Sequence, residues 1–365
     1  MNIVIAGNAD SIWIREYIKN VIEISNNNIY IISEQCDKYD EWYKKNNIQV
    51  LKFGTKNFFV ENIKIVKIIG RCDVLHIQYV DIYMLMRTFL LAMYSKRYIL
   101  TFWGSDLLRA SKRKKIFYKP FLNYSNQIIV MTYSMKSVFE QLYGKKYNKK
   151  TRIIDFGNSV YEYIQQVDEK FGKDGCKKIL KLPRDKYCIA IGYNSIKEQN
   201  HMQIIKNLIG VPQNILEKCY FVFHFGYGKY DKDYKEQLED VMKEHNFHYM
   251  FIERYLDLYE VAILRNSIDV FLYGQTTDAM SGSALEYVYA GSTFIKPKWL
   301  DYSELQNRHI KIWEYETFEE IKRVFCFVIK NQLFASKEEI VYAQNTLDKY
   351  NSWKVLKEQW RNMYK

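Results

Sequence analysis

Short strand-like runs that alternate with helical stretches are the feature that most limits how this chain can fold. Helices are expected at Ser11–Ile24 and Thr132–Tyr143. The strand-like runs of the first half are rich in β-branched residues and lie at Asn2–Ala6, Ile29–Ser33, Gln49–Phe53, Asp73–Gln78, Arg97–Phe102, Gln127–Met131 and Arg152–Asp155. Strands that alternate with helices predict βαβ units and a parallel sheet.

The same alternation begins again after a polar, basic stretch at Asp168–Arg184. The strands expected there are Tyr187–Ile191, Tyr220–Phe225, His248–Ile252, Ile268–Tyr273 and Thr293–Ile295. The helices expected between them are Met202–Leu208, Tyr230–His245, Leu256–Asn266 and Ser283–Ala290. A chain of 365 residues is long enough for two domains. We therefore expect an α/β domain over residues 1–170, a second over residues 185–340, and a terminal helical segment over residues 341–365.

The excess of basic residues is confined to the first half. Residues 1–175 carry 27 Lys or Arg and 17 Asp or Glu, whereas residues 176–365 carry 27 and 25. The excess peaks at Arg109–Lys119, which has six cations and no acid. Nucleic acid, an anionic membrane surface and a phosphorylated substrate are the possible partners, and a solvated helix face is the alternative without a partner. Neighbouring aromatics such as Phe117 and Tyr118 favour the membrane surface, and no nucleic-acid-binding signature accompanies the charge.

Three further features indicate the compartment. The apolar runs, such as Arg87–Met93, are shorter than the roughly 18–20 residues of a spanning helix. The first residues lack the basic and apolar regions of a signal peptide. Six cysteines are scattered without metal-ligand spacing, which is typical of free thiols in a reducing cytosol. We expect a cytoplasmic protein.

Parallel sheets bind ligands at the carboxyl ends of their strands. The strand ends of this chain carry glycines and polar residues, namely Gly7-Asn8, Trp103-Gly104-Ser105-Asp106, Gly192-Tyr193-Asn194, Gly226-Tyr227-Gly228 and Gly274–Ser283. The segment from Asp278 to Gly291 is the most informative, because a turn of small residues there opens a helix. Backbone N–H groups at a helix start bind phosphate, and Glu286, one turn later, is suited to accept two ribose hydroxyls. A capping segment with an exposed Glu is the alternative.

This segment resembles the donor-binding motif of GT-B glycosyltransferases, which places two acids eight positions apart. Asp278 and Glu286 occupy these positions, although the first is usually Glu in that family. The segment Phe251–Leu272 is similar to the base-binding loop, helix and strand of the same enzymes. Residues 73–78, 98–109, 125–136 and 152–157 match their amino-terminal domain in order. The resemblance implies two Rossmann-like domains whose parallel sheets face each other across a cleft, with a terminal helix that crosses back to the first domain.

Two details resemble the 4-acetamido-fucose transferases that extend lipid-linked glycans. These are Phe102-Trp103-Gly104-Ser105-Asp106-Leu107 and the segment from Gly192 to His201. In the second segment the Arg that is common in GT-B enzymes is absent, so only Lys197 is available as a phosphate-binding cation. The donor-binding residues that the resemblance implies are Gly192, Asn194, Lys197, Asn200, His201, Gly226, Tyr255, Asp278, Ser281, Gly282, Ser283 and Glu286.

Asp10 and Asp106 are the candidate general bases. Both follow strands of the first half, where inverting GT-B enzymes bind the acceptor, and a carboxylate there is able to take a proton from an acceptor hydroxyl. The alternative for each is a helix cap or a turn residue. Gly7, Asn8, Trp103 and Ser105 complete the expected acceptor side. Whether the transfer inverts or retains the anomeric centre stays open.

The resemblance implies a glycosyltransferase that moves a sugar from a nucleotide-sugar to an oligosaccharide or polyprenyl-diphosphate-linked acceptor in bacterial surface polysaccharide synthesis. It implies no cofactor and no metal, because helix termini and Lys197 would neutralise the leaving diphosphate. The enzyme would be peripheral on the inner face of the cell membrane, attached through Arg109–Lys119, without a nucleic-acid partner. Two alternatives remain: an inactive GT-B scaffold, and a GT-B nucleotide-sugar epimerase, which would not need the basic face.

Overall fold

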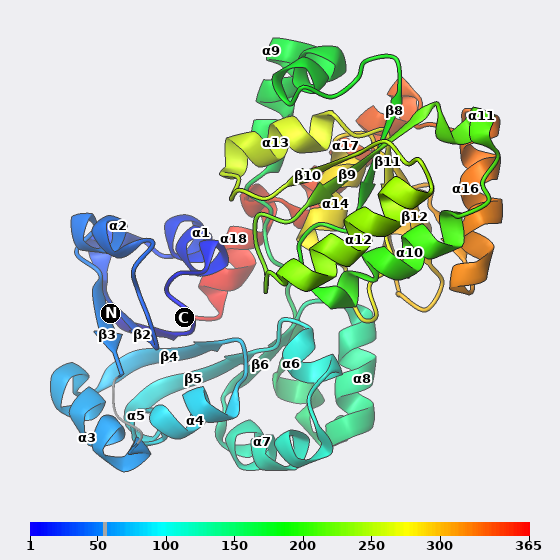
Figure 1. Ribbon diagram of the computed structural model, residues 1–365. Helices are drawn as coiled ribbons and strands as arrows, with labels where there is room; N and C mark the ends of the chain where they lie inside the picture. The colour runs from blue at the N-terminus through cyan, green and yellow to red at the C-terminus, as the bar shows by residue number, and fades with distance from the viewer. Residues whose placement is uncertain (54–56) are drawn as a thin grey trace. The chain divides into compact units, whose positions relative to one another are not determined.

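The computed structural model describes residues 1–53 and 57–365, and the chain forms two compact units (Figure 1). The first unit comprises Met1–Gly157 together with Trp353–Lys365, and the second comprises Asn158–Ser352. Each unit is built on one parallel sheet, which confirms the two α/β units expected from the sequence. Among the described residues, no helix combines the length and the apolar character needed to cross a bilayer.

The first unit has a seven-stranded sheet in the order β3-β2-β1-β4-β5-β6-β7. Every neighbouring pair is parallel, so all carboxyl ends lie at one edge. Ile3 of β1 pairs with Ile29 of β2 and Val74 of β4, which places the apolar runs side by side. The strands are β1 (Asn2–Ala6), β2 (Asn28–Ser33), β3 (Gln49–Lys52), β4 (Cys72–Gln78), β5 (Ser95–Thr101), β6 (Gln127–Val130) and β7 (Thr151–Ile153).

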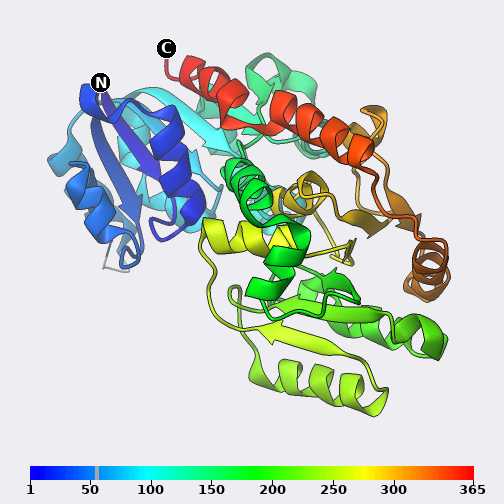
Figure 2. The ribbon, with the colours of Figure 1, turned by 90° about the horizontal axis from the view of Figure 1, so that it is seen from above.

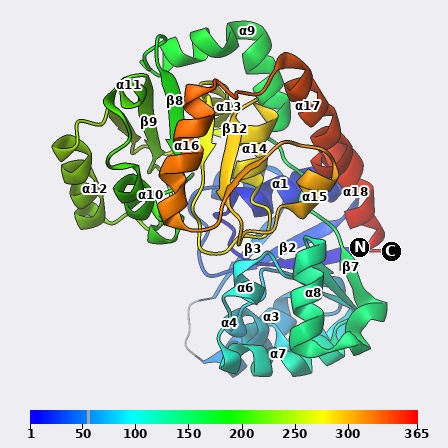
Figure 3. The same cartoon turned by 90° about the vertical axis from the view of Figure 1, so that its right-hand side faces the viewer.

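Helices cover both faces of this sheet, because its central strands are buried on both sides. The helices are α1 (Ile12–Val21), α2 (Asp40–Lys45), α3 (Phe58–Ile69), α4 (Ile82–Arg87), α5 (Phe89–Tyr94), α6 (Ser105–Leu108), α7 (Lys112–Tyr124), α8 (Tyr133–Tyr143) and α18 (Trp353–Asn362), with short 3-10 turns at Ile24–Asn26 and Lys145–Lys150. Helices α1 and α18 pack together on one face, and α3, α4, α5 and α7 lie on the other (Figures 1 and 3).

The second unit has a six-stranded parallel sheet in the order β10-β9-β8-β11-β12-β13. The strand order reverses between β8 and β11, and in such sheets ligands bind beside this point. The strands are β8 (Tyr187–Ile191), β9 (Cys219–His224), β10 (Tyr249–Ile252), β11 (Val270–Leu272), β12 (Thr293–Pro297) and β13 (Trp313–Tyr315). The last of these is absent from the strands expected from the sequence.

Two apolar cores lie on the two faces of this sheet. Cys188 and Ala190 of β8 point to one core, and Ile189 and Ile191 point to the other, as alternation along a strand requires. In Figure 2 the strands lie between α12, in yellow-green, and α13, in yellow. The helices are α9 (Tyr161–Ile179), α10 (His201–Leu208), α11 (Gln213–Leu216), α12 (Lys232–Glu244), α13 (Leu258–Asn266), α14 (Gly282–Tyr289), α15 (Ser303–Asn307), α16 (Ile321–Lys330) and α17 (Lys337–Asn351), with 3-10 turns at Lys197–Gln199 and Phe318–Glu320.

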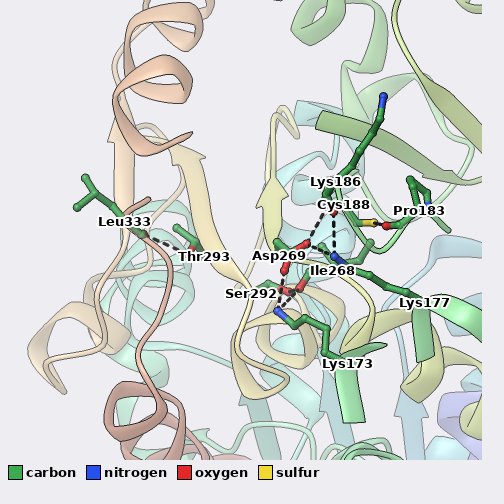
Figure 4. A network of polar contacts seen from close by, with 10 residues as sticks. All are labelled: Lys173, Lys177, Pro183, Lys186, Cys188, Ile268, Asp269, Ser292, Thr293 and Leu333. Carbon is green, nitrogen blue, oxygen red and sulfur yellow. Dashed lines mark hydrogen bonds and ion pairs between the residues drawn. The ribbon is translucent and has the colours of Figure 1, made fainter. Parts of the chain in front are cut away.

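The boundary between the units lies earlier than the sequence suggests. The polar, basic stretch at Asp168–Arg184 lies largely in helix α9, which packs against α13 of the second unit. Its Lys173 and Lys177 donate to the two carboxylate oxygens of Asp269, at 2.9 and 2.8 Å (Figure 4). The backbone N–H of Cys188 also donates to Asp269, at 2.8 Å. These two lysines therefore attach α9 to Asp269, which directly precedes β11.

Replacing Asp269 by asparagine is expected to lower the free energy of unfolding by about 3–5 kcal/mol, because Lys177 is buried and would lose its counter-charge. Burial would raise the pKa of Asp269, but Lys173 and Lys177 outweigh it and hold the pKa below its ordinary value. The pair therefore stabilises the fold above about pH 4 and loses its effect as the pH falls further. Urea unfolding measures this change, and Glu316→Gln, which breaks the exposed pair with Lys298, should change the result little.

The end of the chain returns to the first unit. The sequence suggests one helix from about residue 341, whereas the structure has α17 in the second unit and α18 in the first, separated at Ser352. Tyr364 then bonds to the buried His76 of β4, with 2.9 Å between the hydroxyl and Nδ1. Trp360 is fully buried and donates its indole N–H to the carbonyl of Asp155 at 2.9 Å. The terminal segment is thus part of the first unit's core.

Candidate active site

Asp10 lies in the loop after β1, which begins at Gly7. Its Oδ1 accepts the backbone N–H groups of Asp37 and Lys38, both at 2.8 Å, and this holds the loop after β2. Asn8 is exposed, and its Oδ1 accepts the N–H of Asp10 at 3.0 Å. Within the described chain, Oδ2 of Asp10 accepts no hydrogen bond. One oxygen therefore orders the loops, and the other remains able to accept a proton.

Asp106 has a different environment, in the loop and short helix after β5. It is buried and accepts three backbone N–H groups, from Val80 at 2.8 Å and from Trp103 and Gly104 at 2.9 Å each. Burial raises the pKa of Asp106 to about 7, and these N–H groups act against that rise. Both carboxylate oxygens are occupied, so the side chain joins the loops after β4 and β5. Of the two candidate bases, Asp10 is the better placed.

The end of β4 adds Gln78 and Tyr79, and α1 adds Trp13, three residues that sequence reasoning missed. Gln78 is buried, and its Oε1 accepts the indole N–H of Trp103 at 3.0 Å, while its Nε2 has no partner among the described residues. Tyr79 adopts a left-handed conformation with φ of 76° and shares a hydrogen bond of 3.1 Å with Ser105. Trp13 packs edge-on against Trp103. An unpartnered amide and a strained residue at one strand end are typical of a binding site.

Two glycines shape the strand ends of the second unit. Gly192 follows β8 with φ of 64°, and a Cβ there would lie 2.8 Å from Nε2 of His201. Gly226 follows β9, and a Cβ there would lie 1.8 Å from the carbonyl oxygen of Arg254. Neither position accommodates a side chain without moving its neighbours. The predicted residues Gly192, His201 and Gly226 are thus brought to the same edge of the sheet.

Asp278 organises the turn before α14. Its carboxylate accepts the hydroxyls of Tyr273, at 3.0 Å, and Tyr302, and also the N–H of Ser281 at 3.1 Å. Burial raises the pKa of Asp278, and these donors oppose the rise. Met280, between them, has a left-handed φ of 61°. Asp278 therefore holds a strained turn at the head of the helix, next to Gly282 and Ser283.

Glu286 is buried one turn into α14 and is paired with a cation that sequence reasoning did not single out. Arg265 of α13 donates to Oε2 through Nε and Nη2, both at 3.0 Å. Asn158 donates to Oε1 at 3.2 Å and to the carbonyl of Gly282 at 3.2 Å. Burial raises the pKa of Glu286, and the Arg265 guanidinium acts in the opposite direction. The alternative of an exposed Glu is wrong, and the ribose role stays a prediction.

Buried polar atoms without partners lie around this pair. Nη1 of Arg265 and both ring nitrogens of His224 accept or donate no hydrogen bond within the described residues. His224 ends β9, and burial lowers its pKa to about 3, with Arg265 and Arg254 adding to the shift. His224 is therefore neutral at pH 7. Buried groups of this kind are costly unless a ligand or water satisfies them.

The remaining predicted donor residues are placed as follows. Lys197 is exposed and pairs with Asp231 at 2.7 Å, so its ammonium is already compensated in this structure. Asn200 donates to the carbonyl of Gly274 at 2.7 Å and begins α10. Asn194 is buried and accepts the N–H of Ile196 at 3.2 Å. Tyr255 is exposed, directly after Arg254.

Among the described residues, no three His, Cys, Asp or Glu side chains gather in a way that would hold a metal ion. The polar groups of the second unit instead comprise a guanidinium, an imidazole, hydroxyls and the N–H groups at the start of α14. These groups suit an anionic, hydroxyl-bearing ligand.

Arg265, His224, Tyr302 and Gln78 were missed because no residue type or spacing around them distinguishes a ligand contact from a structural one. A buried polar residue looks the same in the sequence whether it is satisfied by the fold or by a ligand. The sequence offers one signal for Arg265, which directly follows the apolar run of residues 261–264.

Comparison with known proteins identifies relatives of this fold. Residues 2–154 match the family model described as glycosyl transferase 4-like. The whole chain superposes on a glycosyltransferase from Rickettsia africae with TM-score 0.77 and 14% identity, covering 100% of this chain and 97% of that one. A sucrose-phosphate synthase from Thermosynechococcus elongatus gives TM-score 0.79 and 12% identity, covering 100% and 98%.

Anabaena HepE, solved in complex with UDP-glucose, gives TM-score 0.75 and 10% identity, covering 99% of this chain and 98% of that one. No curated protein matches the chain by sequence. Identities this low establish the fold alone. The chain therefore has the GT-B fold, and its residues 2–154 match the glycosyl transferase 4-like family model.

Proposed function

We propose that this protein transfers a sugar from a nucleotide-sugar donor, held by the second unit, to a glycan acceptor held by the first. The observation that carries the proposal is the buried Glu286–Arg265 pair at the head of α14, with unpartnered nitrogens on Arg265 and His224. Glu286 would accept ribose hydroxyls, while Nη1 of Arg265 and the first N–H groups of α14 would face the diphosphate. The likeness to Anabaena HepE, solved with UDP-glucose, supports the choice of ligand.

In this proposal Asp10 takes the proton of the acceptor hydroxyl. The acceptor oxygen then forms a bond to the anomeric carbon, and the bond from that carbon to the donor's phosphate oxygen breaks. The nucleoside diphosphate leaves with the bonding electron pair, and the start of α14 stabilises its charge. Lys197 is paired with Asp231 in this structure, so the proposal adds Nη1 of Arg265 as a second cation for the diphosphate. The scheme uses no metal.

The acceptor we propose is an oligosaccharide on a polyprenyl diphosphate, in bacterial surface polysaccharide synthesis. The enzyme would work at the cytoplasmic face of the membrane, attached through the cations of Arg109–Lys119. The superposition on WaaG, described as a glycosyltransferase involved in lipopolysaccharide biosynthesis, is compatible with such a role.

Nucleoside diphosphates are expected to raise the unfolding temperature, because a ligand that binds only the folded state stabilises it by mass action. At a concentration about 100 times Kd the gain is about 2.7 kcal/mol. Differential scanning fluorimetry with UDP, GDP and dTDP, and with the matching nucleosides as controls, would rank the bases. A protein that responds equally to nucleosides and diphosphates, or to neither, would contradict the proposal.

Product analysis then separates transfer from its alternatives. Incubation with the donor that binds best should release nucleoside diphosphate, and faster when acceptor is present. Interconversion of the intact donor would indicate an epimerase instead. Binding without any turnover, across acceptors extracted from bacterial membranes, would indicate a scaffold.

A further inference from the structure

The helices α3, α4 and α5 of the first unit form an apolar surface, which we call the α3–α5 face. A groove of about 650 Å³ runs across it and is lined by Asn57, Phe58, Phe59, Asn62, Met86, Phe89 and Leu90. Phe59 is 67% exposed and Phe89 47% exposed. Exposed apolar patches of this kind mark interaction sites on soluble proteins.

The exposed apolar side chains are numerous and continue onto the basic helix beside the groove. They are Phe59, Val60, Ile68, Tyr83, Phe89, Met93, Tyr94, Ile116 and Tyr124. Helix α7 contacts α4, and Phe121 of α7 packs edge-on against Phe89 of α5. Figures 1 and 3 both show α3, α4 and α7 on the same face of the sheet.

The charge around the α3–α5 face is strongly positive. Residues 57–124 carry twelve Lys or Arg and four Asp or Glu. Two of the acids, Glu61 and Asp106, are buried. Lys112, Arg113, Lys115 and Lys119 form no ion pair within the described residues, and Lys114 reaches Asp81 only at 4.0 Å. Unpaired cations beside an exposed apolar groove match a surface that is anionic at its headgroups and apolar beneath them.

We propose that the α3–α5 face and helix α7 together bind the surface of an anionic bilayer, with Phe59, Phe89 and their neighbours inserted below the headgroups. This deepens the proposed membrane attachment and rests in part on the proposed action on a lipid-linked acceptor. The inference assigns different roles to the two parts of this surface. The cations of α7 attract the protein to the surface, and the apolar side chains of α3 and α5 hold it there.

Because the two parts act differently, the vesicle affinities of two sets of variants should depend differently on salt. Phe59→Ser with Phe89→Ser should weaken binding to vesicles of phosphatidylglycerol and phosphatidylcholine in equal parts by about tenfold or more, with the salt dependence retained. A variant with serine at Lys112, Arg113, Lys114 and Lys115 should bind these vesicles more weakly at low salt, by roughly fivefold for each cation removed. At high salt its affinity should differ little from that of the wild type. Vesicle flotation measures both.

The matched control is Phe327→Ser in the second unit, since Phe327 is 52% exposed but lies outside the α3–α5 face. It should bind vesicles as the wild type does. A dye on Val60→Cys should shift to the blue when vesicles are added, and the same dye on Phe327→Cys should not. This second pair tests insertion even where a serine variant fails to fold.

Three results would overturn the inference: flotation of the phenylalanine double variant equal to wild type, equal wild-type binding to pure phosphatidylcholine, or no dye shift at Val60. If the wild type is an oligomer in solution and the phenylalanine double variant is a monomer, the face binds a second copy of the chain instead. Nucleoside diphosphate binding should be unchanged in every variant. The two experiments are therefore independent. A negative vesicle result would overturn this inference without affecting the proposed function, and a negative nucleotide result would overturn the proposed function without affecting vesicle binding.

Discussion

Asp10→Asn is expected to lower turnover by about 10²–10⁴-fold, the usual contribution of a general base. Asparagine keeps an Oδ1 that accepts the N–H groups of Asp37 and Lys38, so the loops should stay in place. It replaces the free Oδ2 by an amide that takes no proton. Nucleotide affinity, which the proposed function assigns to the second unit, should not change. Steady-state kinetics and calorimetry of the same preparation check both statements.

The matched control for Asp10 is Asp106→Asn. Both oxygens of Asp106 accept backbone N–H groups, and an amide nitrogen would face a donor, which costs about 1–3 kcal/mol per unsatisfied group. This variant should therefore unfold at lower denaturant while the folded fraction retains turnover. Normal turnover of Asp10→Asn would remove the support for an inverting transfer, and NMR of the product's anomeric proton would decide the stereochemistry.

Glu286→Ala is expected to weaken nucleotide binding and also to lower the free energy of unfolding by about 3–5 kcal/mol. The second effect arises because Arg265 would be left buried without its counter-charge. From the sequence alone, a ribose-binding Glu286 is expected to be removable without harm to the fold. The buried pair corrects that expectation. Calorimetry with a nucleoside diphosphate and urea unfolding measure the two effects separately.

A double variant distinguishes the two roles of this pair. Glu286→Ala with Arg265→Met removes both charges, and it should recover much of the lost stability, since an apolar replacement of a buried ion pair is often close to neutral. It should not recover nucleotide affinity. Recovery of both would show that the pair only supports the fold, and the ribose assignment would then be wrong.

The local pattern predicts most elements of the two sheets, because the central strands, such as β1 and β8, are short apolar runs that are buried on both faces. Strands β1 and β8 agree with the expected bounds at both ends. The pattern does not predict α9, where lysines of the polar, basic stretch are paired with Asp269 some ninety residues away. It also misses β13, an edge strand of three residues that is too short to show a periodic pattern.

The sequence by itself determined the two α/β units and the strand ends at which Asp10, Gly192, Gly226 and Asp278 lie. These depend on local periodicity and on turn residues, which act over a few positions. Only the tertiary structure decided that Glu286 is paired with Arg265 and that both oxygens of Asp106 accept backbone N–H groups. It also decided that several apolar side chains of α3 and α5 stay exposed. Burial and pairing are set by residues far apart in the chain, so no local pattern contains them.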